Sequence, residues 1–313
     1  MSINPQLQAF LANFPKVDYN DFTLEQIREL AAAPLPEGIP APEIASSVDQ
    51  DVETPGGVRR IRVQRPLGEG PKPTLVFIHG GGWVVGSPDA VDPETRRLAA
   101  YLDAVLVSIS YRLAPEAQFP AGYEDALFLT RWASEHVDEL GGRADQFAIA
   151  GESAGGNLAA AIAVALREEN ILAGQLLFNP ATDLGPTFRD AASFRADLDP
   201  ALTSVNTDYS VRQYLGTESS TDWRASPAYA DKFTGVPPAV IGISGNDPLH
   251  DQGKEYGDRL TAAGVPTRIV DFEDLVHAYA AQSFLFPVCN DALMHTCDEF
   301  RALLGWPTPA SSK

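Results

Sequence analysis

Two glycine-rich motifs contain the residues of this sequence that are best suited to chemistry. The first occupies residues 151–155, which read Gly-Glu-Ser-Ala-Gly and lie between a short apolar run and an alanine-rich segment. A G-x-S-x-G motif between a strand and a helix forms a sharp, strained turn that exposes the serine hydroxyl. We therefore expect Ser153 to be a nucleophile, with a glycine-rich turn of no chemical role as the alternative.

The second motif favours the chemical interpretation. Residues 79–83 read His-Gly-Gly-Gly-Trp and follow another apolar run. Consecutive glycines allow backbone N–H groups to converge on one point, where they can hold the negative oxygen of a tetrahedral intermediate. Trp83, which follows these glycines, is expected to contact a substrate. The predicted oxyanion-hole donors are the backbone N–H groups of Gly81, Gly82 and Ala154.

A serine nucleophile needs a base, and His277 is the predicted base. It follows the last apolar run of the chain, and a parallel sheet places its site in the loops at the carboxyl ends of its strands. His79 belongs to the glycine motif and is interpreted as a structural side chain. The remaining histidines are His136 and His295, on expected helices, and His250.

Asp247 is the predicted acid that orients the base. It follows the apolar run 239–243 and completes the chain order Ser, Asp, His that accompanies a G-x-S-x-G nucleophile. The alternative for Asp247 is an ordinary turn residue, because aspartate next to proline often has that role. Rival acids by proximity are Asp251, Asp271, Glu273 and Asp274.

Short apolar runs alternate with helical patterns through most of the chain. A predicted hairpin, with strands at residues 48–54 and 58–66, precedes them. The later runs comprise residues 74–78, 104–109, 146–150, 175–178, 239–243 and 267–272. Runs that are apolar throughout are typical of strands buried on both faces, and their alternation with helices predicts a mainly parallel sheet of about eight strands flanked by helices.

The composition excludes several partners. The 313 residues include 42 Asp and Glu against 23 Lys and Arg, a formal net charge of −19, which opposes nucleic acid and anionic membrane surfaces. No apolar run approaches the roughly 20 residues of a membrane span, and the first 13 residues lack the Lys or Arg of a signal peptide. We therefore predict a cytoplasmic location. No metal-ligand or nucleotide-binding motif is visible, so no metal and no cofactor are predicted.

These motifs together resemble the hormone-sensitive-lipase-like family of bacterial esterases. The matching segments are residues 79–83, 111–116, 119–120, 124–126, 151–156 and 247–249, with His277. The resemblance implies an α/β-hydrolase fold and a carboxylesterase that acts on small-molecule esters of short to medium chain length without a cofactor. Some members of the family dimerise through the last strand and helix, so a homodimer is an implied partner.

The resemblance also implies a helical cap. It would come from residues 1–45, where capping patterns predict two helices at Asn4-Pro5 and at Thr23, and from residues 185–230, which lack a strong strand. The chain is then a single domain, residues 1–313, whose catalytic core comprises residues 46–184 and 231–313. Glu152 and the Ala-Tyr pair after His277 depart from the common family pattern and bear on the substrate range.

The predicted reaction is ester hydrolysis through an acyl-enzyme on Ser153, with His277 as base and Asp247 as its partner. The same residues could serve an arylformamidase, a lactonase or a carbamate hydrolase, and the sequence barely separates these. A small-molecule receptor on this fold is a further alternative, which the presence of His277 disfavours. A lipase acting on oil droplets is disfavoured by the acidic charge and the cap.

Overall fold

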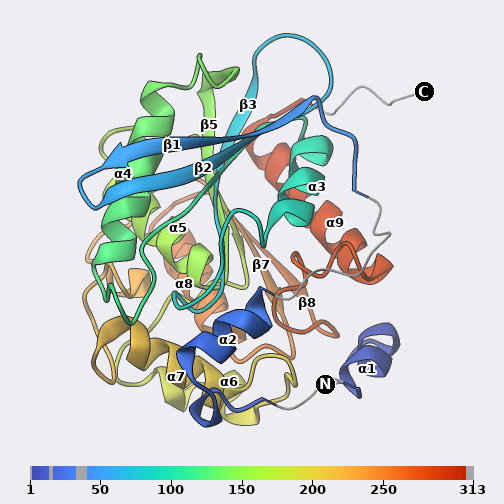
Figure 1. Cartoon of the computed structure of the whole chain (residues 1–313), viewed down its shortest axis with the longest axis vertical. Helices are drawn as coiled ribbons and strands as arrows, with labels where there is room; N and C mark the ends of the chain where they lie inside the picture. The colour runs from blue at the N-terminus through green and yellow to red at the C-terminus, as the bar shows by residue number, and fades with distance from the viewer. Residues whose placement is uncertain (1, 14–16, 33–40, 308–313) are drawn as a thin grey trace.

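An eight-stranded sheet forms the centre of the protein (Figure 1). The computed structural model describes residues 2–13, 17–32 and 41–307. The strands are β1 (Ser46–Thr54), β2 (Gly57–Arg65), β3 (Lys72–Ile78), β4 (Val105–Ile109), β5 (Gly142–Glu152), β6 (Gln175–Phe178), β7 (Ala239–Ser244) and β8 (Thr267–Phe272). Their order in the sheet is β1-β2-β4-β3-β5-β6-β7-β8.

Most of the sheet is parallel. The β1–β2 hairpin is antiparallel, β2 pairs with β4 antiparallel, and every pair from β4 to β8 runs parallel. Successive residues of a strand point to opposite faces. In β3, Val76 and Ile78 accordingly join one buried core, and Leu75 and Phe77 join the other. Both faces are therefore covered, as the apolar runs predicted.

Helices cover both faces of the sheet. The helices α4 (Ala121–Glu135), α5 (Ala154–Ala165) and α8 (His250–Ala262) contribute to the core on one face. On the other face lie α3 (Asp92–Leu102) and α9 (Pro287–Leu304). Figure 1 shows these two groups on either side of the strands. The predicted α/β fold with a mainly parallel sheet is confirmed.

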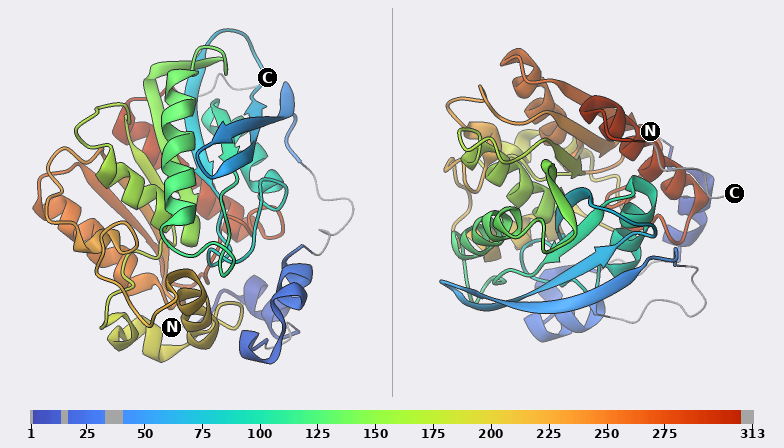
Figure 2. Two further views of the ribbon diagram at one scale, coloured as in Figure 1. Left: turned by 60° about the vertical axis from the view of Figure 1, so that its left-hand side comes forward. Right: turned by 90° about the horizontal axis from the view of Figure 1, so that it is seen from above.

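Three helices gather at one end of the sheet. They are α2 (Leu24–Ala31), α6 (Ala192–Ala196) and α7 (Ser204–Leu215), and both ribbon views place them together (Figures 1 and 2). Short 3₁₀ turns accompany them: η1 (Tyr19–Asp21), η2 (Phe188–Asp190) and η3 (Pro227–Tyr229). The Asn206 side chain accepts the N–H of Tyr19 at 2.9 Å and donates to the Val17 carbonyl at 2.8 Å, which joins η1 to α7.

The first helix lies elsewhere. Helix α1 (Pro5–Leu11) has the predicted Asn4 cap, and the Asn4 side chain also donates to the Asp274 carboxylate at 2.7 Å. The Phe10 ring packs edge-on against Phe286, 5.2 Å between centroids. Helix α2 has the predicted capping box of Thr23 and Gln26. Of the two N-terminal helices, α2 therefore neighbours α7, whereas α1 contacts the segment before α9.

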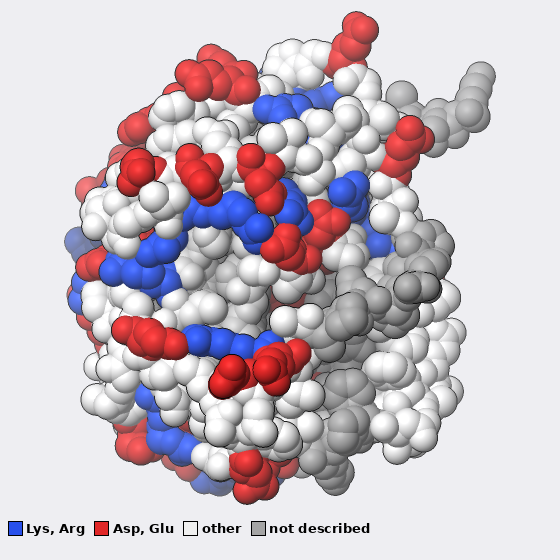
Figure 3. Space-filling model, viewed as in Figure 1, with Lys and Arg blue, Asp and Glu red and all other residues white. Residues whose placement is uncertain are grey.

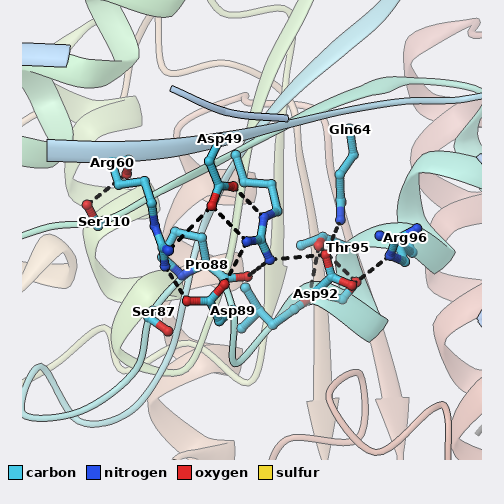
Figure 4. Close-up of polar contacts among 12 residues, drawn as sticks. Asp49, Arg60, Gln64, Ser87, Pro88, Asp89, Asp92, Thr95, Arg96 and Ser110 are labelled. Carbon is cyan, nitrogen blue, oxygen red and sulfur yellow. Dashed lines mark hydrogen bonds and ion pairs between the residues drawn. The ribbon is translucent and has the colours of Figure 1, made fainter. Parts of the chain in front are cut away.

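An ion-pair cluster fastens the hairpin to the rest of the molecule. Arginines and acidic residues lie side by side on the face seen in Figure 3. The Arg62 guanidinium on β2 bonds Asp49 on β1, Asp89 in the loop before α3 and Asp92 on α3. Figure 4 labels these three acidic residues. One side chain thus joins two strands, a loop and a helix.

Within the described ranges, no helix is long and apolar enough to cross a bilayer.

Candidate active site

Ser153 occupies a strained turn between β5 and α5. Its φ of 56° and ψ of −118° are unusual for a residue with a side chain. A Cβ on Gly155 would lie 1.9 Å from the Ile78 carbonyl oxygen, and one on Gly151 would lie 2.3 Å from the Gly155 carbonyl oxygen. Only glycine fits these two positions, so the close crossing of the backbone explains the spacing of the motif.

A chain of hydrogen bonds joins the three residues predicted from sequence. His277 Nε2 lies 2.9 Å from Ser153 Oγ, and His277 Nδ1 lies 2.8 Å from Asp247 Oδ2. His277 is in the loop after β8, and Asp247 is in the loop after β7. Both side chains are buried. The structure therefore brings together a serine, a histidine and an aspartate in the geometry that nucleophilic acyl transfer uses.

Asp247 is held by partners besides His277. Its Oδ1 accepts the backbone N–H of Leu249 at 2.8 Å, and its Oδ2 also accepts Asn179 Nδ2 at 2.7 Å. Asn179 directly follows β6 and donates a second bond from the same nitrogen to Ser244 Oγ at 3.1 Å. The sequence analysis did not identify Asn179, although a polar residue at the end of a buried strand was the available signal.

Other histidines and acidic residues that could have served as base or acid bond elsewhere. His250 bonds both Asp251 and Asp271 at 3.0 Å. Asp274 bonds Asn4 on the N-terminal segment. His79 stacks on Tyr111 with 4.3 Å between ring centroids, and burial lowers its pKa to about 4. A neutral, stacked His79 agrees with its interpretation as a structural side chain of the glycine loop.

The glycine loop lies against the nucleophile turn. A Cβ on Gly80 would meet the Glu152 carbonyl oxygen at 3.0 Å and Ser153 Cβ at 3.4 Å. Gly81 and Gly82 have φ of 107° and 58°, which glycine adopts without strain. No hydrogen bond from the backbone N–H of Gly81, Gly82 or Ala154 to another described residue is present. All three donors are thus available to a substrate oxygen.

A cavity of about 330 Å³ opens beside Ser153, and Trp83 is among the residues that line it. Trp83 stacks on Tyr214 of α7 with 4.4 Å between centroids and 6° between planes. The apolar lining includes Ile27, Ala31, Val84, Val85, Leu202, Val211 and Leu249. Among the described lining residues there is no Lys or Arg, and Glu152 is the one acidic residue. The cavity therefore suits an uncharged, largely apolar ligand.

Burial and the neighbouring acidic groups act on the pKa of His277 in opposite directions. Burial lowers its pKa, but the charges of Asp247, Asp199 and Glu152 raise it, and the net pKa shift is upward. For Glu152, burial raises the pKa to about 7 against the opposing charge of His277. An imidazole that readily accepts a proton is what a general base needs.

Residues 75–281 match a protein family described by the alpha/beta hydrolase fold. The chain belongs to this family. A carboxylesterase of Mycobacterium tuberculosis, NlhH, is 35% identical over 93% of this chain and 92% of its own. An arylesterase of Saccharolobus solfataricus is 30% identical over 89% and 92% of the two chains. The predicted resemblance to hormone-sensitive-lipase-like esterases is confirmed.

A solved structure of this α/β-hydrolase family agrees over nearly the whole length. The hyperthermophilic esterase of the archaeon Pyrobaculum calidifontis superposes with a TM-score of 0.85, at 30% identity, and covers 97% of this chain and 99% of its own. The similarity spans the sheet and the segments around its site. The hydrogen-bonded residues described above therefore lie within a fold that other esterases share.

Proposed function

We propose that this α/β-hydrolase is a serine carboxylesterase in which Ser153, His277 and Asp247 are the catalytic residues. That the chain is an ester-hydrolysing enzyme follows from its family and its esterase relatives. The continuous chain of hydrogen bonds from Ser153 Oγ through His277 to Asp247 Oδ2 supports the assignment of the roles.

The proposed reaction has two halves. His277 Nε2 removes the Ser153 proton as Oγ attacks the ester carbonyl carbon, and the N–H groups of Gly81, Gly82 and Ala154 hold the oxyanion. His277 then gives the proton to the leaving alcohol, which leaves an acyl-enzyme. Water attacks that acyl group by the same route and releases the acid. Asp247 keeps the His277 tautomer and stabilises its cation.

The cavity supports a preference for uncharged esters of short- to medium-chain acids. Its volume of about 330 Å³ lies at the lower end of the range for small-molecule sites. Side chains from α2, α7 and the glycine loop line it and limit the room for a long acyl chain. Trp83 is proposed to contact the substrate, and residues 1–45 and 185–230 to form the cap.

The test is hydrolysis of p-nitrophenyl esters from acetate to palmitate. We expect a maximum of kcat/KM at short or medium chains and loss of several orders of magnitude in Ser153→Ala. Ser204→Ala, which removes a half-buried hydroxyl at the start of α7 outside the cavity lining, is the matched control and should keep its rate. No turnover on any chain length by the intact protein would favour the amide, lactone or carbamate alternatives, or a receptor.

A double variant tests whether the residues act as one unit. Ser153→Ala combined with His277→Ala should lose little more rate than either single change, because each alone removes the same proton transfer. Fully additive losses would contradict a shared nucleophile and base. The cytoplasmic location and the homodimer stay predictions from the sequence and from the family resemblance.

A further inference from the structure

A third carboxylate contacts the loop that carries the base. Asp199 lies between α6 and α7, 78 residues from His277 in the sequence, and is 1% exposed. Its Oδ2 accepts a hydrogen bond from the backbone N–H of His277 at 2.5 Å. A residue of the proposed cap therefore bonds directly to the residue proposed as general base.

The second oxygen of this carboxylate bonds within the proposed cap. Asp199 Oδ1 accepts the backbone N–H of Ala201 at 2.8 Å and of Leu202 at 3.3 Å. Both residues line the substrate cavity. Among the described residues no Lys or Arg forms an ion pair with Asp199, and three backbone N–H groups donate to it. One carboxylate thus joins the cavity wall to the loop of the base.

A local turn explains only half of this arrangement. Aspartate side chains often accept the N–H two residues ahead, and the bond from Ala201 to Oδ1 has that form. The bond from His277 to Oδ2 contributes nothing to such a turn. Burial of a charged group is costly unless it gains strong hydrogen bonds, so the contact with His277 requires its own explanation.

Three acidic groups from three parts of the fold surround His277. Asp247 follows β7, Glu152 ends β5, and Asp199 comes from the proposed cap. Burial raises the pKa of Asp199 to about 6 and the charge of Asp247 adds to this, while the charge and N–H of His277 oppose it. With a pKa of about 6, Asp199 is ionised in most molecules at pH 7 and adds negative charge near His277.

We propose that Asp199 is a positioning residue, which fixes the His277 loop through its backbone N–H and supplies negative charge that stabilises the imidazolium formed in each acyl transfer. The proposal rests on the serine esterase mechanism proposed above. A charge in a buried site acts over a longer distance than in water, so Asp199 need not touch the ring. The position of the proposed cap and the pKa of His277 are then coupled through the Asp199 side chain.

The first test is the pH dependence of kcat/KM for p-nitrophenyl butyrate. Asp199→Asn keeps the size of the side chain and one acceptor oxygen but removes its charge. The acid limb of the profile reports protonation of the base in the free enzyme. We expect this limb to move about 0.5 to 1 pH unit lower, because His277 loses a negatively charged neighbour.

The matched control is Asp197→Asn. Asp197 lies two residues earlier in the same segment, is exposed, and accepts the backbone N–H and the hydroxyl of Ser204. Its variant should keep the acid limb of the wild type. If Asp199→Asn does not fold, Asp199→Ser provides the same loss of charge in a smaller side chain. An acid limb at the wild-type pH in a folded Asp199 variant, at whatever rate, would overturn the proposal.

A second measurement does not depend on turnover. The His277 imidazole can be titrated by NMR in the wild type and in Asp199→Asn, with the signal assigned from His277→Gln. We expect a lower His277 pKa in Asp199→Asn, and an equal pKa in both would overturn the proposal. Failure of the wild type to hydrolyse any ester would instead contradict the proposed function and leave this comparison intact.

Discussion

The three side chains proposed to act in catalysis come from turns that directly follow strands. Ser153 follows β5, Asp247 follows β7 and His277 follows β8. The end of β5 and all of β7 are buried and apolar, whereas β8 is half-buried. Sequence patterns locate such strands well, and a polar residue just beyond one is conspicuous. This explains why the candidate site could be predicted residue by residue.

Two supporting residues could not be predicted in this way. Asn179 bonds Asp247, 68 residues away, and Asp199 bonds His277, 78 residues away. Asn179 at least follows a predicted strand. Asp199 lies in a segment without periodicity, where a sequence does not reveal which distant backbone group a carboxylate will meet. Long-range contacts from irregular segments are therefore the part of the site that sequence reasoning misses.

Glu94 gives a prediction about stability and pH at the scale of one residue. It is 1% exposed, and neither carboxylate oxygen has a hydrogen-bond partner among the described residues. Burial, followed by the charge of Glu152, raises the pKa of Glu94 well above its usual value. The folded protein thus binds a proton that the unfolded chain releases near pH 4.5, and stability is lost as the pH rises from there through the folded pKa.

We expect Glu94→Gln to remove this loss. Measured by urea unfolding, the variant should gain stability relative to the wild type as the pH rises from 5 to 8, by at most about 1.4 kcal/mol for each pH unit. Glu53→Gln, at an exposed position on β1, is the control and should follow the wild type. Equal pH dependence in Glu94→Gln and the wild type would show that Glu94 ionises freely in the folded state.

The strands of the sheet were easier to predict than the short helices gathered at one end of it. Strands β6 and β8 have the predicted bounds, whereas β5 begins at Gly142 rather than at residue 146. Residues 185–230 lack a strong strand, as the sequence indicated, but the five-residue α6 and the 3₁₀ turns within them were not predicted. Elements of one turn or so have too few residues to show a hydrophobic period, and tertiary packing decides their conformation.

Arg62 gives a prediction at the scale of elements. Its side chain is 15% exposed and joins β2 to β1, to the loop before α3 and to α3, through acidic residues that Figure 4 labels. Arg62→Met keeps most of the apolar stem but leaves Asp49, Asp89 and Asp92 without this shared cation. We expect the free energy of unfolding to fall by about 1–3 kcal/mol, because a partly buried network is worth more than an exposed pair.

The control for this prediction is Arg143→Met. Arg143 pairs with Asp145, two residues along the same strand, and both side chains are exposed. This pair connects no two helices or strands, so the free energy of unfolding measured in urea should not change in Arg143→Met. A similar fall in the free energy of unfolding in both variants would mean that Arg62 stabilises the protein only through its charge. Its contacts between separate helices and strands would then add nothing.

At the scale of the whole molecule, the formal net charge of −19 is the dominant electrostatic feature. Many arginines already lie beside acidic partners (Figure 3), so the surplus acidic groups repel one another without local compensation. Raising the ionic strength from 0.01 M to 0.15 M shortens the Debye length from about 30 Å to about 8 Å. Screening over that range weakens long-range repulsion and leaves the short, partly buried pairs largely intact.

We therefore expect Tm to rise by a few degrees between 10 and 150 mM NaCl and then to level off, as measured by calorimetry at pH 7.5. The rise should be larger in Arg62→Met, because three neighbouring carboxylates have lost their shared cation and add to the repulsion that salt relieves. A Tm that keeps rising into molar NaCl would indicate adaptation to salt rather than simple screening. A Tm that falls with NaCl in the wild type would mean that local ion pairs outweigh the net repulsion, and the acidic surplus would then serve solubility alone.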